Sequence, residues 1–194
     1  MKAIFFSFCL IFSLLTYGQK KSNLSSTDHY AQQTDEKRSL NKLTAKSLDH
    51  MSIPGGAVTG YYENTALVLI YTTYGAEHGY ISYSYYLRHD SLLLVKELKE
   101  FWKFSNEEDY ERFEDYRKTH TDEKGETDLS GWPMETDDDN AYYFQDTVIV
   151  DFKIRSFKTA KTVTEKEISD MNKDLMRRLR IHCGELAYVR GKKE

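Results

Sequence analysis

The chain has 194 residues, with 27 Lys or Arg against 31 Asp or Glu and a formal net charge of −4. This length suits one domain and is short for two. The mild negative charge and a sequence pI near 5.9 argue against a nucleic-acid-binding protein, because such domains are typically basic.

The chain begins with one lysine and an apolar run over residues 3–15, followed by a small residue at Gly18. This order is typical of a secretory signal peptide, and the run is shorter than the roughly 20 apolar residues of a membrane-spanning helix. We expect residues 1–18 to be removed and the protein to be exported, to a periplasm or to the exterior. No later run is long enough for a membrane span. Cleavage would leave Cys183 alone, so no internal disulfide is expected.

The next part of the chain divides in two. Residues 19–34 are polar and predict a flexible lead-in. Residues 35–51 carry three leucines at helical spacing and predict an amphipathic helix. "IPGG" at 53–56 then breaks the chain. A single domain is therefore expected over residues 35–194.

Three later segments share a Tyr-Tyr pair, a short polar turn and an aliphatic run. They read "GYYENTALVLI" at 60–70, "SYYLRHDSLLLV" at 84–95 and "AYYFQDTVIVDF" at 141–152. Aromatic and β-branched residues favour strands. Asn or Asp in the turns tolerates the left-handed backbone of tight hairpins. Each segment is therefore expected to form a β-hairpin.

These hairpins predict an antiparallel β-meander of about six strands, over residues 57–63, 66–74, 80–88, 92–104, 141–145 and 148–157. In the last strand we expect Val148, Val150, Phe152 and Ile154 to face the core. An acidic insertion, residues 105–140, separates the second and third hairpins, with fourteen acidic residues against four Lys or Arg. Its three aromatic residues at i, i+3 and i+6 from Tyr110 predict a short helix whose aromatic edge lies on the sheet.

A helix is expected near the C-terminal end. Thr164 and Glu167 have the spacing of a capping box, and apolar residues follow at the period of one helix face. Gly184 is expected to end this helix, and "ELAYV" at 185–189 predicts a short closing strand. The predicted fold class is therefore α+β, an antiparallel meander with an N-terminal and a C-terminal helix and an acidic insertion.

The pieces "GGAVTGYYEN", "SYYLRHDSLLLV" and "YYFQDTVIV" resemble a group of small exported bacterial proteins of unknown function. Those proteins combine a GG-x-[VL]-T-G-YY start with YYF-[DN]-x-x-L hairpins. The resemblance covers about residues 55–155. The chain also has a weaker similarity to MORN-type repeats, but it lacks the regular glycines of that pattern. Both resemblances imply a sheet, and neither carries a catalytic residue over to this chain.

The sequence lacks the motifs of common enzyme classes. The six histidines are scattered and none forms HExxH. A GxSxG nucleophile elbow is absent, and "IPGGAVTG" lacks the Lys-Ser/Thr of a phosphate loop. We predict no catalytic residue and no cofactor, and favour a non-enzymatic protein. A secreted hydrolase with dispersed Asp, Glu and His stays an alternative, because active sites also form without a motif.

One candidate ligand site uses the tyrosines. Side chains alternate between the two faces of a strand, so one ring of each Tyr-Tyr pair should lie on the second face of the sheet. Tyr62, Tyr86 and Tyr143 would form an aromatic platform there, suited to a sugar ring or an extended peptide. The alternative is that a helix covers this face.

A second candidate site is a calcium site at Asp137, Asp138 and Asp139 in the insertion, because calcium prefers oxygen ligands. The spacing of the acidic residues does not match an EF-hand, and the alternative is a solvated acidic loop with no metal. The sequence as a whole predicts an exported, non-enzymatic module that binds an unknown partner protein or a cell-envelope component. The second hypothesis is a carbohydrate-binding module for envelope glycans that uses an exposed Tyr face.

Overall fold

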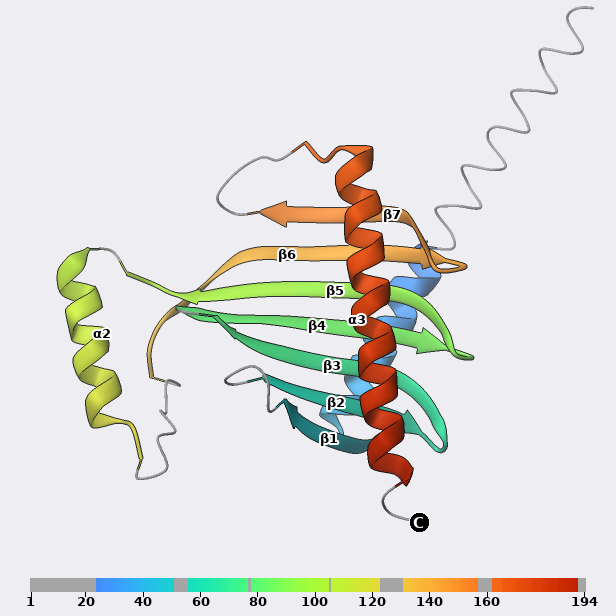
Figure 1. Cartoon of the computed structure of the whole chain (residues 1–194), viewed down its shortest axis with the longest axis horizontal. Coiled ribbons are helices and arrows are strands. Elements are labelled where there is room, and N and C mark those ends of the chain that lie inside the picture. Colours follow the sequence, from blue (N-terminus) through green and yellow to red (C-terminus); the bar gives the residue numbers. More distant parts are fainter. Residues whose placement is uncertain are drawn as a thin grey trace, which may run out of the picture.

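The structure, a computed structural model, describes residues 24–50, 56–76, 78–104, 106–122, 131–156 and 162–191. A seven-stranded antiparallel sheet forms its centre, with the strands in chain order from β1 to β7. The long helix α3 crosses one face of the sheet, and an N-terminal helix of residues 24–39 crosses the other (Figure 1). The predicted α+β class and the meander are confirmed. The signal peptide expected over residues 1–18 lies outside the described residues.

The strands are β1 (Thr44–His50), β2 (Gly56–Glu63), β3 (Ala66–Ala76), β4 (Gly79–Arg88), β5 (Ser91–Trp102), β6 (Met134–Gln145) and β7 (Val148–Ser156). The six predicted strands correspond to β2–β7. The largest difference is at β6, which begins at Met134 rather than at residue 141, because it pairs with β5 as far as Trp102. The last part of the acidic insertion therefore belongs to the sheet.

The three predicted hairpins have turns of the same length, and the second and third also share one turn geometry. Each closes through a two-residue turn, and positive φ angles occur at Asn64 in the first hairpin, at His89 and Asp90 in the second, and at Asp146 and Thr147 in the third. Two consecutive positive φ angles are typical of a type I′ turn, whose twist matches that of the flanking strands. The turn residues predicted from the sequence therefore lie where the turns form.

The bulges show that the first Tyr-Tyr pair is displaced by one residue from the other two. The register shifts lie between Tyr61 and Tyr62, between Tyr86 and Leu87, and between Tyr143 and Phe144. Tyr61 is thus the structural equivalent of Tyr86 and Tyr143. A displacement of one residue moves a side chain to the other face of a sheet, so Tyr62 lies on the opposite face from Tyr86.

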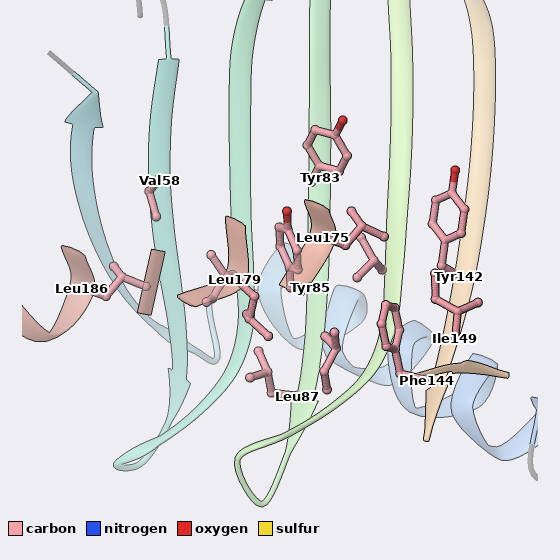
Figure 2. Packing of buried hydrophobic residues seen from close by; sticks show 13 residues of the cluster. Val58, Tyr83, Tyr85, Leu87, Tyr142, Phe144, Ile149, Leu175, Leu179 and Leu186 are labelled. Carbon is pink, nitrogen blue, oxygen red and sulfur yellow. The ribbon is translucent and has the colours of Figure 1, made fainter. Parts of the chain in front are cut away.

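Helix α3 (Glu165–Gly191) covers the face that carries the first tyrosine of the later two pairs. The capping box is confirmed: Thr164 N donates to Glu167 Oε2 at 2.9 Å, and Glu167 N donates to Thr164 Oγ1 at 3.3 Å. Leu175, Leu179 and Leu186 of α3 pack on a cluster that includes Tyr85 (Figure 2).

The predicted end of α3 is wrong, because the helix continues through Gly184 and residues 185–189 are helical. A glycine inside a helix costs only about 1 kcal/mol. Leu186 is 2% exposed, and a Cβ at Gly60 would lie 2.9 Å from its Cδ1. The burial of Leu186 in the space above Gly60 stabilises the helix by more than Gly184 destabilises it.

The N-terminal part also differs from the prediction. Residues 24–34, expected as a flexible lead-in, belong to the helix of residues 24–39, and the helix expected over 35–51 is wrong in position. Asn41, at φ 53°, turns the chain after the helix. Residues 44–50 then pair with β2 along their whole length. Backbone pairing at the edge of the sheet outweighs the helical leucine pattern.

Strand β7 corrects another expectation. Val148, Val150 and Phe152 are 55%, 40% and 38% exposed, and Ile149 is buried in their place. The bulge after Tyr143 moves the alternation of the paired strand by one residue at this end. Val148 and Phe152 consequently lie on opposite faces of the sheet, and Ile154 is half-buried.

Helix α2 (Glu107–Thr119) lies beyond the end of β5, away from α3 (Figure 1). Asn106 is its N-cap and accepts a hydrogen bond from Asp109 N at 2.9 Å. Phe113 is fully buried, with its ring centroid 4.8 Å from that of Trp102 and 5.1 Å from that of Trp132. The helix thus makes a small aromatic cluster at the end of the sheet rather than on its face. No helix within the described ranges is long and apolar enough to cross a membrane.

Candidate functional site

Two of the three tyrosines proposed as an aromatic platform lie beneath the N-terminal helix. Tyr86 is 1% exposed and Tyr143 is 2% exposed. The Tyr86 hydroxyl donates to the Asp35 carboxylate at 2.8 and 2.9 Å, and the Tyr143 hydroxyl donates to Asp28 Oδ1 at 2.6 Å. Burial and the carboxylate of Asp35 raise the pKa of Tyr86. Tyr86 therefore stays a neutral donor at neutral pH.

A lysine completes each of these contacts. Lys96 Nζ lies 5.0 Å from the Tyr86 ring centroid and 3.2 Å from Asp35 Oδ2. In the third hairpin, Lys153 Nζ lies 4.9 Å from the Tyr143 ring centroid and 2.9 Å from Asp28 Oδ2. The Tyr–Asp–Lys group thus occurs twice, and it attaches the N-terminal helix to the sheet.

Tyr62 is separated from Tyr86 and Tyr143 by the sheet itself. A Cβ at Gly60 would lie 3.1 Å from Tyr62 Cε2 and 2.9 Å from Leu186 of α3, so the Tyr62 ring is on the α3 face. The three tyrosines do not form one open row. The covering helix considered as the alternative is present over Tyr86 and Tyr143.

The three aspartates proposed for calcium diverge. Asp138 Oδ2 accepts a hydrogen bond from Lys99 Nζ at 2.8 Å, whereas Asp139 lies across from Arg155 with 3.9 Å between charged atoms. Asp137 lies at a register irregularity between these strands. Successive strand residues point to opposite faces, so the three carboxylates do not converge. Among the described residues, no three His, Cys, Asp or Glu side chains are grouped as metal ligands.

The structure instead contains a cleft that was not predicted, between β5–β7 and the first half of α3. Its volume is about 530 Å³. Its apolar wall is formed by Ile154, Val163, Ile168 and Met171. Its acidic lining comes from Glu97, Asp138, Glu167, Asp170 and Asp174, and Lys99 is the single basic residue among the lining residues that the structure describes.

Glu97 forms the floor of this cleft and is 3% exposed. The Tyr83 hydroxyl donates to its Oε1 at 2.9 Å, and Asn140 Nδ2 and the Tyr142 hydroxyl donate to its Oε2 at 2.8 and 3.3 Å. Figure 2 shows the hydroxyls of Tyr83 and Tyr142 pointing away from the hairpin turns. A buried carboxylate needs such donors, because an unpaired charge in the interior is very costly.

Lys99 joins two carboxylates of the floor. Its Nζ lies 3.6 Å from Glu97 Oε1 and 2.8 Å from Asp138 Oδ2. Burial lowers the pKa of Lys99, but the hydrogen bond to Asp138 and the charge of Glu97 raise it further, so the net shift is upward. Lys99 is therefore a cation at neutral pH. Its ammonium group therefore bridges Glu97 and Asp138.

Asn140 leaves one polar atom of the floor unsatisfied. The side chain is 5% exposed, and its amide donates to Glu97, but Oδ1 is buried and accepts no hydrogen bond. Buried polar atoms in folded proteins are almost always paired. Oδ1 of Asn140 is therefore an exception among the buried polar atoms of the floor.

The α3 side of the cleft is partly neutralised. Asp174 binds Arg177 and Arg178 at 2.7 and 2.6 Å, and Asp170 lies 3.4 Å from Lys173. The Asp170–Lys173 pair is exposed, where an ion pair contributes little. Arg178 is half-buried, with its guanidinium 5.3 Å from the Tyr83 ring centroid. Among the described lining residues, the buried acceptor without a hydrogen bond, Oδ1 of Asn140, is on the floor.

Sequence reasoning missed the floor of the cleft. Glu97 is flanked by Lys96 and Lys99 in a segment that also fits a helix, so it reads as a solvated residue. One signal was present: Glu97 follows the buried Val95 at a strand spacing of two, on the side that faces α3. Asp138 is the single predicted site residue that lines the cleft.

No protein-family model matches the chain, and neither a curated protein nor a solved structure matches it. The resemblance to exported proteins with Tyr-Tyr hairpins therefore stays a prediction.

Proposed function

We propose that the protein is an exported, non-enzymatic module that binds a partner protein of the cell envelope through the cleft beside α3. The observation that carries this proposal is the floor of the cleft, where Glu97 and Asp138 share one lysine and Asn140 has an unpaired acceptor. An apolar wall beside buried polar groups is the usual composition of a binding pocket.

A carbohydrate-binding module is the second candidate, and it depends on open aromatic rings. Tyr86 and Tyr143 are covered by the N-terminal helix. Glycan binding would require the N-terminal helix to move away from these rings. Partner binding at the cleft requires no such movement, so we favour it over glycan binding.

Export rests on the signal-peptide pattern at residues 1–18. N-terminal sequencing of the protein purified from its native host is expected to begin at Gln19, in a periplasmic or secreted fraction. An intact Met1 on a cytoplasmic species would contradict export.

Partner binding is tested by photo-crosslinking in the native host. Asp170→p-benzoylphenylalanine places the probe on the exposed helix face of the cleft, and Ser47→p-benzoylphenylalanine places it on β1, at the far edge of the sheet. A discrete adduct is expected from position 170 and not from position 47. Adding Asp138→Asn should abolish the adduct, and adding Asp139→Asn should preserve it. Identical adducts from both positions, or none from position 170, would overturn the proposal.

A further inference from the structure

Strand β7 is the last strand of the described sheet, and two of its backbone N–H groups are bound by side chains. Ile149 N donates to Asn172 Oδ1 of α3 at 2.9 Å, and Phe152 N donates to Asp151 Oδ1 at 2.8 Å. A strand added at this edge would need such N–H groups as donors. We infer that these two side-chain caps prevent β7 from pairing with β7 of a second copy of this chain, an inference that goes beyond the proposed function.

The residues of this strand otherwise favour self-association. The segment reads "VIVDF" at 148–152, and Val148, Val150 and Phe152 are exposed. β-branched and aromatic residues favour strands. An edge strand of this composition presents a row of backbone donors and acceptors to any strand that approaches. The caps therefore act at a position where pairing would otherwise be favourable.

A second copy fits this edge because β7 is complementary in charge to itself. When two β7 strands pair in antiparallel fashion about Phe152, Asp151 of each copy lies opposite Lys153 of the other. Opposite charges directly across two strands stabilise the pair. Lys153 is about half exposed although it also binds Asp28. This pairing requires the Phe152 N–H group in both copies, and Asp151 occupies that group.

The shape of the strand supports the same conclusion. Two consecutive residues of β6 pair with Ile149 and with Asp151, so Val150 is an extra residue in β7. Such a bulge bends and twists an edge strand, and is one of the features by which native sheets avoid edge pairing. Helix α3 crosses the sheet as far as β7, which places Asn172 beside Ile149 (Figure 1). The caps and the bulge thus act on the same five-residue segment.

The test compares variants of the mature full-length protein that lose a capping acceptor with variants that keep it. Asn172→Ala and Asp151→Ala each free one N–H group, whereas Asn172→Asp and Asp151→Asn keep an acceptor oxygen. Sedimentation velocity over a wide range of protein concentration measures the dimer dissociation constant. Asn172→Ala should lower it by about tenfold or more, because a symmetric dimer gains two hydrogen bonds.

Asp151→Ala should lower this constant by about threefold or more, because loss of the pair with Lys153 offsets part of the gain. The double alanine variant should dimerise at concentrations where the unaltered protein and the two acceptor-keeping variants are monomers. Photo-crosslinking locates the contact: in the double variant, Val150→p-benzoylphenylalanine should give a dimer-sized adduct. Ser47→p-benzoylphenylalanine, on β1 at the other edge of the sheet, should give none.

Melting curves establish that each variant is folded. If the double variant is unfolded, Asp151→Ala alone decides the question, because the bond from Phe152 to Asp151 is exposed and its loss does not threaten the core. A folded alanine variant that stays monomeric would overturn the inference. Equal dimerisation of the acceptor-keeping variants, or a dimer that crosslinks from position 47 and not from position 150, would also overturn it.

Discussion

Two neighbouring tyrosines show how differently one residue type is used on the two faces of the sheet. Tyr85 and Tyr86 are 0% and 1% exposed. The Tyr86 hydroxyl donates to Asp35, whereas the Tyr85 hydroxyl is buried without a hydrogen-bond partner. Both rings fill core space, so truncation of either to alanine should cost about 3–5 kcal/mol. Only one of the two hydroxyls stabilises the fold.

Phenylalanine substitutions should therefore have opposite effects. Tyr86→Phe removes a hydrogen bond to a carboxylate and should lower the free energy of unfolding by about 1.5–3 kcal/mol. Tyr85→Phe removes an unsatisfied buried hydroxyl and should leave the free energy of unfolding unchanged or raise it. Urea unfolding followed by circular dichroism measures both variants. Similar losses in the two would show that the Tyr85 hydroxyl has a partner in solution.

Glu97 is a second residue whose neutral isostere is informative. Glu97→Gln keeps the side-chain volume but removes the charged group that accepts hydrogen bonds from Tyr83 and Asn140 and forms an ion pair with Lys99. The free energy of unfolding should fall by about 2–3 kcal/mol in urea titrations, since bonds to a buried charge are strong. The control, Glu63→Gln, breaks an exposed pair with Lys37 and should cost less than about 1 kcal/mol. A loss no larger than that of the control would mean that Glu97 is solvated.

At the scale of the elements, the hairpin turns still carry strain. Asp90 has φ 60° in the second hairpin, and Asp146 has φ 49° in the third. A left-handed backbone costs most residues about 1–2 kcal/mol, although Asp and Asn tolerate it better. Glycine is the residue best suited to such positions.

Asp90→Gly is expected to raise the free energy of unfolding by up to about 1 kcal/mol, because relief of the left-handed strain exceeds the added entropy of the unfolded chain. The control is Thr65→Gly, at the equivalent turn position but without a positive φ. That change should lower the free energy of unfolding by about 0.5–1 kcal/mol. Thermal melts of both variants give the comparison. If both changes destabilised equally, the turn at Asp90 would be unstrained.

The elements that could be predicted are those whose signals are local. The hairpins were predictable because the turn residues and the flanking aromatic residues occur within ten residues of each other, three times. Strand β1 was not predictable, because "TAKSLDH" becomes a strand only by pairing with β2. The displacement of the first Tyr-Tyr pair is equally hidden, since one residue less before the turn moves Tyr62 to the other face.

The cleft could not be predicted for the same reason. Its floor comes from β5 and β6, and its other side comes from α3, about 70 residues beyond Glu97. Asp138 was considered only with its two sequence neighbours, which point elsewhere. A site assembled across elements has no spacing motif, so its residues appear as ordinary charged positions of a strand and a helix.

For the whole molecule, the buried tyrosines predict how the fold responds to alkali. Burial, with nearby negative charge for Tyr83, Tyr86 and Tyr142, raises the pKa of Tyr83, Tyr85, Tyr86 and Tyr142 above the ordinary value of 10.0. A raised folded-state pKa means that the stabilisation is complete below pH 10 and is lost as pH rises above it, when the unfolded chain ionises first. Each such tyrosine contributes up to about 1.4 kcal/mol per pH unit to this loss.

We therefore expect cooperative unfolding above pH 10, with tyrosinate absorbance and loss of the far-ultraviolet circular dichroism signal in one transition. In the variant with both Tyr85→Phe and Tyr142→Phe, the free energy of unfolding should fall less steeply with pH above pH 10. The reason is that unfolding then releases two fewer protons. Tyrosinate absorbance that titrates smoothly while the fold persists would show that these hydroxyls reach solvent.

The repeated Tyr–Asp–Lys contact also matches a length along the N-terminal helix to a distance across the strands of the sheet. Asp28 and Asp35 are seven residues apart, which is about 10.5 Å along a helix that rises 1.5 Å per residue. Their partners Tyr143 and Tyr86 lie on β6 and β4, two strands apart, or about 9.6 Å at the usual strand spacing. Two helical turns thus span one hairpin. If the sheet had one more hairpin, the helix would need seven more residues to repeat the contact. The width of the sheet and the length of the helix are therefore coupled.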